Sequence, residues 1–224
     1  NSFVIDTIDP SVDTITDDQA GIAFDGADTV EYTLTFSEAV QSVTESDLTV
    51  TGAESFSVAH PANSDTATVT VTVADGSTDN VSITVNDSIV DIAGNPLIEV
   101  TDNLQTVDTV NPEVVAIADD QDGTAFDGAN EVTYTLSFSE AVQSVTKGDL
   151  TVTGAESFLV DHTADTDTAT VTVTVADDSM DNVSITVNDS IVDIAANPLI
   201  EAADNLQTVD TVNPSTIAGA QAVS

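Results

Sequence analysis

The chain contains two copies of one sequence, placed 102 residues apart. Aligned at that offset, residues 1–102 and 103–204 are identical at 74 positions and differ at 28, with no insertion or deletion. A repeat of about 100 residues can enclose its own hydrophobic core, so the duplication predicts a tandem array. We expect domains at 1–107 and 108–209, and the start of a third repeat or a tail at 210–224.

Apolar and polar residues alternate with a period of two in several segments of each repeat, including Val30–Phe36, Ala67–Val73 and Val81–Val85. This alternation is typical of strands with one buried face, and the abundant Val and Thr favour strands. Four further apolar segments lie near residues 12–16, 48–50, 56–58 and 98–107. Seven strands in about 100 residues predict an all-β fold of two tandem Ig-like β-sandwiches in an end-to-end array.

The charge of the chain is extreme, with 40 acidic residues against one basic residue, Lys147, and a formal net charge of −39. Such a charge repels phosphate backbones and anionic membrane surfaces, which argues against nucleic acid as a partner. No apolar run is long enough for direct membrane insertion. Self-repulsion destabilises a compact domain unless salt screens it or cations bind. Two explanations of the acidic composition therefore stay open: adaptation to a salty environment, and a set of cation-binding sites.

Catalytic motifs are missing from the sequence. There is no Cys, and no nucleophile elbow, phosphate-binding loop or zinc-protease motif. His60 and His162 lie without a positioned nucleophile, and we interpret them as exposed loop side chains. Glycoside hydrolysis would use paired carboxylates, but a chain with no Trp and two Tyr is poorly equipped to build an aromatic cleft. We expect that the protein is not an enzyme.

Acidic residues cluster in loops that an Ig-like sandwich places at its two ends. Successive strands reverse direction, so with strands lettered A to G the AB and EF loops share the end where strand G leaves. The BC and FG loops share the opposite end, where the chain enters the sandwich. In the second repeat, the linker 106–112 would reach this end from the first repeat. Carboxylates of two repeats and the linker would then converge on one junction. The candidate ligands are Asp17, Asp18, Asp25, Glu38, Asp47, Asp75, Asp79, Asp91, Asp108, Asp119, Asp120, Asp127, Glu140, Asp149, Asp177, Asp181, Asp193 and Asp210.

Clustered carboxylates repel one another unless a cation neutralises them. Ca²⁺ accepts about 6–8 oxygen ligands in a flexible geometry that suits loops, whereas Mg²⁺ requires a strict octahedron. Zn²⁺ and copper prefer His or Cys. We expect several Ca²⁺ ions as the cofactor. For single residues simpler roles stay open: Asp in turns, Asp47 and Asp149 as caps of their own loops, and Glu38 and Glu140 as solvated side chains.

Four motifs resemble bacterial Ig-like repeats of giant calcium-dependent surface adhesins that are exported by type I secretion. In the first repeat they are Phe36–Val40, Asp47–Val50, Asp91–Asn95 and Val107–Pro112. The resemblance implies a non-catalytic extender on the bacterial cell surface, stiffened by Ca²⁺ at the joints. Its partners would be the neighbouring repeats of a monomeric rod. The resemblance also implies that Asp108, Glu140 and Asp193 are the first ligands to consider.

Two departures and one alternative accompany this resemblance. Asp9 of the first linker is replaced by Asn111, and Gly94 by Ala196, so the ligand sets of the joints need not be identical. The alternative is an adhesive module whose loops recognise a glycan or a protein. Its most divergent loop is 60–64, but the changes there resemble drift and do not suggest a pocket.

Overall fold

The computed structural model describes residues 5–23, 29–101, 104–126, 131–200, 202–203 and 207–212. The chain divides into two compact units, Asn1–Val110 and Asn111–Ser224. The repeat predicted this boundary slightly earlier, between residues 107 and 108. Within the described segments, no helix is long and apolar enough to cross a membrane.

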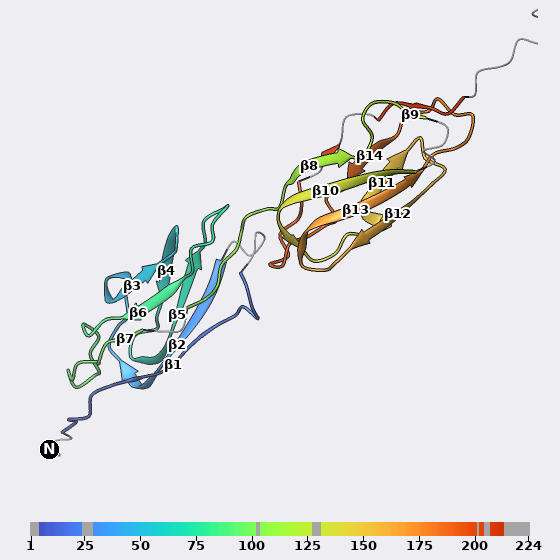
Figure 1. Cartoon of the computed structure of the whole chain (residues 1–224). Helices are drawn as coiled ribbons and strands as arrows, with labels where there is room; N and C mark the ends of the chain where they lie inside the picture. Colours follow the sequence, from blue (N-terminus) through green and yellow to red (C-terminus); the bar gives the residue numbers. More distant parts are fainter. Residues whose placement is uncertain are drawn as a thin grey trace, which may run out of the picture. The chain divides into compact units, whose positions relative to one another are not determined.

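The first unit is a β-sandwich of two antiparallel sheets (Figure 1). One sheet has the order β1 (Val12–Asp17), β2 (Thr29–Val40), β5 (Ser64–Thr72) and β4 (Ser55–Ala59). The other has the order β3 (Leu48–Thr51), β6 (Ser82–Val85) and β7 (Val100–Thr101), and a 3₁₀ turn, η1 (Glu45–Asp47), precedes β3. Lettered A to G, the strands form the sheets ABED and CFG, which is the constant-type immunoglobulin arrangement.

The second unit repeats this arrangement. Its larger sheet has the order β8 (Val114–Asp119), β10 (Glu131–Val142), β13 (Thr166–Thr174) and β12 (Ser157–His162). Its smaller sheet has the order β11 (Leu150–Thr153), β14 (Ser184–Val187) and β15 (Ala202–Ala203), preceded by η2 (Lys147–Asp149). A short parallel pair joins β9 (Ala125–Phe126) to β16 (Val209–Asp210). The predicted all-β fold with two Ig-like sandwiches is therefore confirmed.

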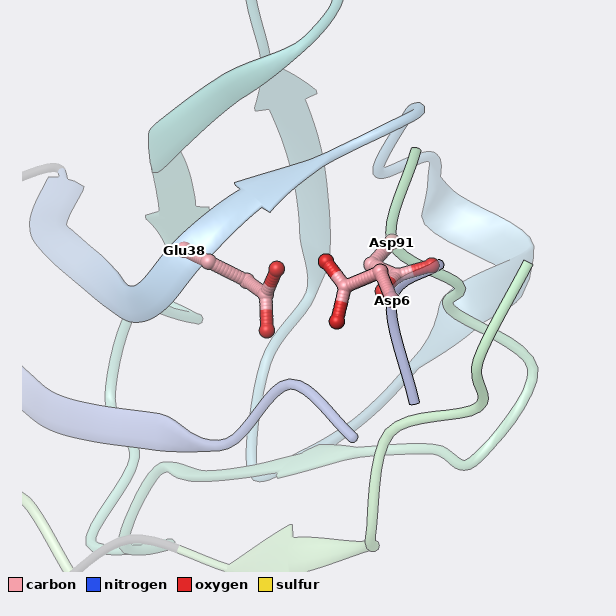
Figure 2. Close-up of side chains that lie close together, drawn as sticks. All are labelled: Asp6, Glu38 and Asp91. Atoms are coloured by element: carbon pink, nitrogen blue, oxygen red, sulfur yellow. The ribbon is translucent and has the colours of Figure 1, made fainter. Parts of the chain in front are cut away.

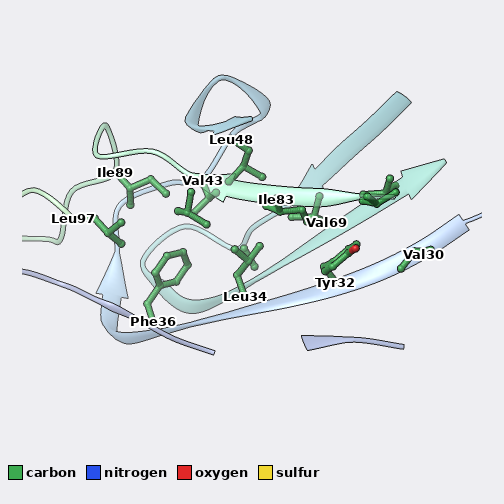
Figure 3. Packing of buried hydrophobic residues seen from close by; sticks show 14 of the residues in the cluster. Val30, Tyr32, Leu34, Phe36, Val43, Leu48, Val69, Ile83, Ile89 and Leu97 are labelled. Carbon is green, nitrogen blue, oxygen red and sulfur yellow. The ribbon is translucent and has the colours of Figure 1, made fainter. Parts of the chain in front are cut away.

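The period-two alternation explains how each core forms. On β2, Val30, Tyr32, Leu34 and Phe36 are buried, while the residues between them are exposed or half-buried. Side chains from both sheets, Ile83 of β6 among them, fill the space between the layers (Figure 3). Since each strand alternates faces, burying one face leaves mainly Thr and Ser on the other, and most of the acidic residues lie in the loops between the strands.

Strand β2 changes partners near its end, and this change positions the site. Its register with β5 is regular up to Thr35 and then shifts before Val40. Val40 forms an antiparallel bridge with Asp91, in the loop that follows β6. Irregular pairing of this kind redirects side chains. The end of β2 thereby brings Glu38 next to the loop between β6 and β7.

Candidate metal centre

Three carboxylates from separate segments of the first unit meet at one end of the sandwich (Figure 2). Asp6 lies in the segment before β1, Glu38 on β2, and Asp91 in the loop after β6. One carboxylate oxygen of each lies within 4.8 Å of the others. Asp91 is fully buried, Glu38 is half-buried and Asp6 is exposed, so the group opens from the sandwich towards the segment that precedes it.

The loop around Asp91 holds its carboxylate in a fixed orientation. Its Oδ1 accepts hydrogen bonds from the backbone N–H of Gly94 (2.5 Å) and of Asn95 (2.8 Å), and its Oδ2 accepts one from Asn95 Nδ2 (2.7 Å). Burial raises the pKa of Asp91, but the hydrogen bonds from Asn95 and Gly94 outweigh it and hold the pKa below its usual value. Asp91 is therefore ionised, and its carboxylate is held in one orientation.

The segment before β1 is tied to the same loop. Asp6 Oδ1 accepts a hydrogen bond from the backbone N–H of Ile8 (3.1 Å), which forms a local turn. Asn95 Nδ2 also donates to the backbone carbonyl of Asp6, at 3.4 Å. A single amide group therefore contacts both the carboxylate of Asp91 and the segment before β1, and it holds the two close together.

Glu38 occupies a position that normally faces the core. It lies midway between the buried residues Phe36 and Val40, with the same period-two parity as both. Desolvation by burial raises the pKa of Glu38, and the negative charges of Asp6 and Asp91 raise it further. A cation bound near Glu38 would offset this repulsion, because a nearby positive charge favours the ionised carboxylate.

The donor set fits a hard divalent cation. Oxygens on opposite sides of a Ca²⁺ ion lie about 5 Å apart, so carboxylate oxygens within 4.8 Å of one another can surround it with little movement. Mg²⁺, with bonds of about 2.1 Å, would draw the oxygens closer. All three side chains are carboxylates, whereas Zn²⁺ and copper favour imidazole or thiolate. Water and backbone carbonyls would complete the shell of about 6–8 oxygens.

Equivalent local geometry exists for the counterparts 102 residues later. Glu140 lies on β10 between the buried residues Phe138 and Val142, and Val142 bridges to Asp193 as Val40 bridges to Asp91. Asp193 accepts hydrogen bonds from the backbone N–H of Asn197 (2.8 Å) and from its Nδ2 (2.7 Å). Asp108 Oδ1, at the end of the first unit, accepts a hydrogen bond from the N–H of Val110 (3.2 Å). This local turn is equivalent to the turn at Asp6.

The predicted ligands in the loops after β1 and β8 lie outside this group. Asp17 Oδ1 accepts a hydrogen bond from Gln19 N–H, and Asp18 Oδ1 accepts one from Glu31 N–H, which fastens the loop to β2. Asp119 and Asp120 have the same contacts in the second unit. Burial raises the pKa of Asp120, but its hydrogen bonds prevail and lower it. These residues form turns, and their role as ligands stays a prediction.

Asp47 and Asp149 act as caps of the 3₁₀ turns. Asp47 Oδ2 accepts hydrogen bonds from Thr44 N–H (2.8 Å) and Thr44 Oγ1 (2.7 Å), and its Oδ1 accepts one from Ser88 Oγ (2.8 Å). Asp149 has equivalent contacts. For both, burial raises the pKa but these hydrogen bonds lower it overall. Neither belongs to a group of three carboxylates among the described residues.

The remaining candidates lie on exposed turns or outside the described residues. Four of them are exposed in the loops after β5 and β13: Asp75, Asp79, Asp177 and Asp181. Asp210 is exposed at the end of β16 and accepts a hydrogen bond from Val212 N–H. Asp25 and Asp127 lie outside the described residues.

The sequence interpretation did not identify Asp6 as a member of the carboxylate group, and it did not identify the structural role of the two histidines. Asp6 was not among the predicted ligands, although the 102-residue offset from Asp108 identifies it. His60 is half-buried and not an exposed loop side chain: its Nδ1 accepts a hydrogen bond from Val43 N–H (3.2 Å), and its Nε2 lies 3.2 Å from the carbonyl of Ser64. The ring ties the turn between β4 and β5 to the segment after β2, and His162 does the same in the second unit.

The seven-stranded sandwiches define a tandem protein of immunoglobulin-like domains. Residues 6–107 match the family model described as bacterial Ig-like domain. The first repeat is thus identified as a bacterial Ig-like domain, and the second, identical at 74 of 102 positions, is a copy of it. No match was found among the curated proteins.

Two bacterial adhesins are among the similar solved structures. The Escherichia coli adhesin FdeC is 10% identical with a TM-score of 0.45; the match covers 88% of this chain and 63% of that one. The Yersinia pseudotuberculosis adhesin InvE is 15% identical with a TM-score of 0.32; the match covers 88% of this chain and 58% of that one. The chain therefore spans less than two thirds of the length of either structure.

Proposed function

We propose that this chain is a non-catalytic extender segment of a bacterial surface adhesin, and that Ca²⁺ restricts movement at the joints between its repeats. The observation that carries the proposal is the group Asp6, Glu38 and Asp91, because it connects the segment before a sandwich to the sandwich itself. A cation that binds all three would hold that segment against the domain, and it would neutralise part of the net charge of −39.

The repeat extends this arrangement to the linker between the two units. By the 102-residue offset, the counterparts of the group are Asp108, Glu140 and Asp193. We propose that they bind a second ion, with Asp108 supplied by the linker and the other two by the second sandwich. Moving the linker away from the sandwich would separate the ligands, so ion binding would oppose the movement. The partners of each repeat would be its neighbours in the same chain, outside the cell.

The first test is calcium titration of the full chain by calorimetry, with Asp193→Asn as the key variant. Removal of one ligand should weaken one site by at least about tenfold, the lower range seen when even a supporting residue of a metal site is removed. The matched control is Asp189→Asn, because Asp189 is exposed in the same loop and the charge change is identical. Equal titrations for both variants would contradict the proposed ligand set.

The second test measures the joint itself. Small-angle scattering of the wild-type chain should show a wider range of conformations in chelator than in Ca²⁺, at equal ionic strength. Asp193→Asn in Ca²⁺ should resemble the wild type in chelator, and Asp189→Asn should not. Scattering profiles that do not change on chelation would overturn the stiffening function, and would leave the acidic residues as a solvated surface.

A further inference from the structure

The residues that follow the last strand of each sandwich bind to the end of that same sandwich. In the first unit, Val107 forms a parallel bridge with Ala23. Ala23 N–H donates to the carbonyl of Thr106, and Asp108 N–H donates to the carbonyl of Ala23, both at 2.9 Å. Val107 N–H also donates to Asn80 Oδ1, at 3.2 Å. The start of the linker is therefore hydrogen-bonded to the first unit through an isolated parallel bridge.

Thr109 completes this attachment with a buried side chain that is only 3% exposed. Its hydroxyl accepts a hydrogen bond from Ser77 N–H (2.8 Å) and donates to the carbonyl of Ala74 (2.8 Å). Its own N–H donates to the carbonyl of Ser77, at 2.9 Å. A hydroxyl can both donate and accept a hydrogen bond, so this threonine pairs with one backbone N–H and one backbone carbonyl in the loop after β5.

The second unit has the same contacts. Thr211 is 2% exposed, accepts from Ser179 N–H (2.8 Å) and donates to the carbonyl of Ala176 (2.8 Å). Both copies of the Asp-Thr pair that follow a sandwich therefore make this attachment. The surface that receives it in the first unit, here called the end surface, consists of Ala23, Ala74, Ser77 and Asn80.

The Asp-Thr pair occurs a third time before the first sandwich. Asp6 accepts a hydrogen bond from Ile8 N–H, and this bond is equivalent to the one from Val110 N–H to Asp108. Thr7, however, is exposed, whereas Thr109 and Thr211 are buried. The segment thus shares the Asp-to-N–H hydrogen bond of the bound linker, and its threonine is exposed.

We propose that Asp6–Ile8 binds the end surface of another copy of this repeat, as 108–110 binds that of the first unit. Neighbouring side chains of an extended segment point to opposite sides, so the Thr can serve the preceding repeat while the Asp serves the following one. No carboxylate takes part in the threonine contacts, so this attachment is independent of cations. It goes beyond the proposed function, in which Ca²⁺ acts only between the linker and the following repeat.

The contacts are tested in the full chain with Thr109→Val, which keeps the shape and removes the hydroxyl. Amide hydrogen exchange at Ser77 should accelerate several-fold to about tenfold, in Ca²⁺ and in chelator alike. Thr7→Val is the matched control and should leave exchange at Ser77 unchanged. Thr109→Ser retains the hydroxyl and should restore protection. Unchanged exchange at Ser77 in Thr109→Val, or protection in the wild type that depends on Ca²⁺, would overturn the proposal.

The binding of Thr7 is tested by placing one more repeat, residues 6–107, in front of Asp6 of the chain. The new joint reads Thr106-Val107-Asp6-Thr7, which matches the natural joint. Thr7→Val should now accelerate exchange at Ser77 of the added repeat, as Thr109→Val does in the original chain. If the variant has no effect there, Asp6–Ile8 does not bind the end surface. Neither experiment depends on whether the carboxylates bind Ca²⁺, so the two proposals can fail separately.

Discussion

The two units have the same core but differ in their turns. Each residue of the second hydrophobic core cluster has an identical residue 102 positions earlier in the first. The substitutions lie outside this core, and some occur where the backbone is left-handed: Gly76 (φ 63°) is replaced by Asp178 (φ 54°), and Gly94 (φ 97°) by Ala196 (φ 82°). The turns keep their conformation without glycine, which indicates that surrounding contacts determine it.

The loop of the candidate metal centre shows which contacts hold the left-handed conformation at positions 94 and 196. Gly94 N–H and Ala196 N–H both donate to the carbonyl three residues earlier, that of Asp91 and of Asp193, at 3.2 Å. The side-chain hydrogen bonds from Asn95 and Asn197 to the same two aspartates are also retained. The hydrogen-bonded loop therefore imposes a left-handed conformation on an alanine that disfavours it by about 1–2 kcal/mol.

The largest expected effect tests the equivalence of the cores. Ile83→Ala and Ile185→Ala each remove a fully buried side chain, and each should lower the free energy of unfolding of its unit by about 2–5 kcal/mol. Chemical denaturation of the full chain measures both. Leu159→Ala, at an exposed position, is the control and should have little effect. Losses for the two isoleucines that differ by more than about 1 kcal/mol would show that the cores are not equivalent.

An exchange of the loop residues sharpens the contrast between the turns. Gly94→Ala should destabilise the first unit by about 1 kcal/mol, and Ala196→Gly should stabilise the second by a similar amount. A Cβ at Gly94 would meet no atom within 4 Å, so the effect comes from the backbone alone. Thermal unfolding of each variant provides the measurement. If both substitutions are neutral, the left-handed conformation carries no strain in this loop.

A smaller effect should come from the single basic residue. Lys147 Nζ lies 5.1 Å from the centroid of the Phe158 ring, whereas the first unit has Glu45 at the equivalent position. Lys147→Glu should destabilise the second unit by about 0.5–1 kcal/mol, the range of exposed cation–π contacts. A double-mutant cycle with Phe158→Leu isolates the contact. Additive effects of the two substitutions would show that the ring does not contribute.

The smallest effect concerns pH in the absence of cations. Glu38 has a raised pKa, so the folded state binds its proton more tightly than the unfolded state does. This contribution is fully present below the unfolded pKa, near the ordinary 4.5, and is lost as pH rises through the folded value. In chelator, Glu38→Gln should therefore stabilise the first unit at neutral pH and not below pH 4.5.

The control for this prediction is the same variant in saturating Ca²⁺. There Glu38→Gln removes a proposed ligand, and it should reduce the stabilisation that Ca²⁺ provides. Asp91 behaves in the opposite sense, because its lowered pKa gives stability above the ordinary 3.8 that is lost as pH falls through the folded value. If the difference in stability between Glu38→Gln and the wild type is the same with and without Ca²⁺, Glu38 does not take part in cation binding.

Much of the fold was predictable because its signals are local. The alternation in Val30–Phe36 requires one buried face, and the observed β2 buries the same four residues. The site was only partly predictable. Glu38 and Asp91 were among the predicted ligands, but so were Asp18, which accepts a hydrogen bond from β2, and Asp47, which caps its own 3₁₀ turn. An aspartate in a loop has the same sequence signature in both roles.

The sequence by itself determined the repeat, the strands, the core and the excess of negative charge, since each follows from residue order over short distances. The family resemblance pointed to Asp108, Glu140 and Asp193, but only the tertiary structure explains how the equivalent side chains of the first unit meet. The shift in β2 after Thr35 and the bridge from Val40 to Asp91 bring Glu38 to that loop. The turn at Asp6 and the amide of Asn95 then bring in the third carboxylate. These contacts join residues up to 89 positions apart, and no local pattern records them.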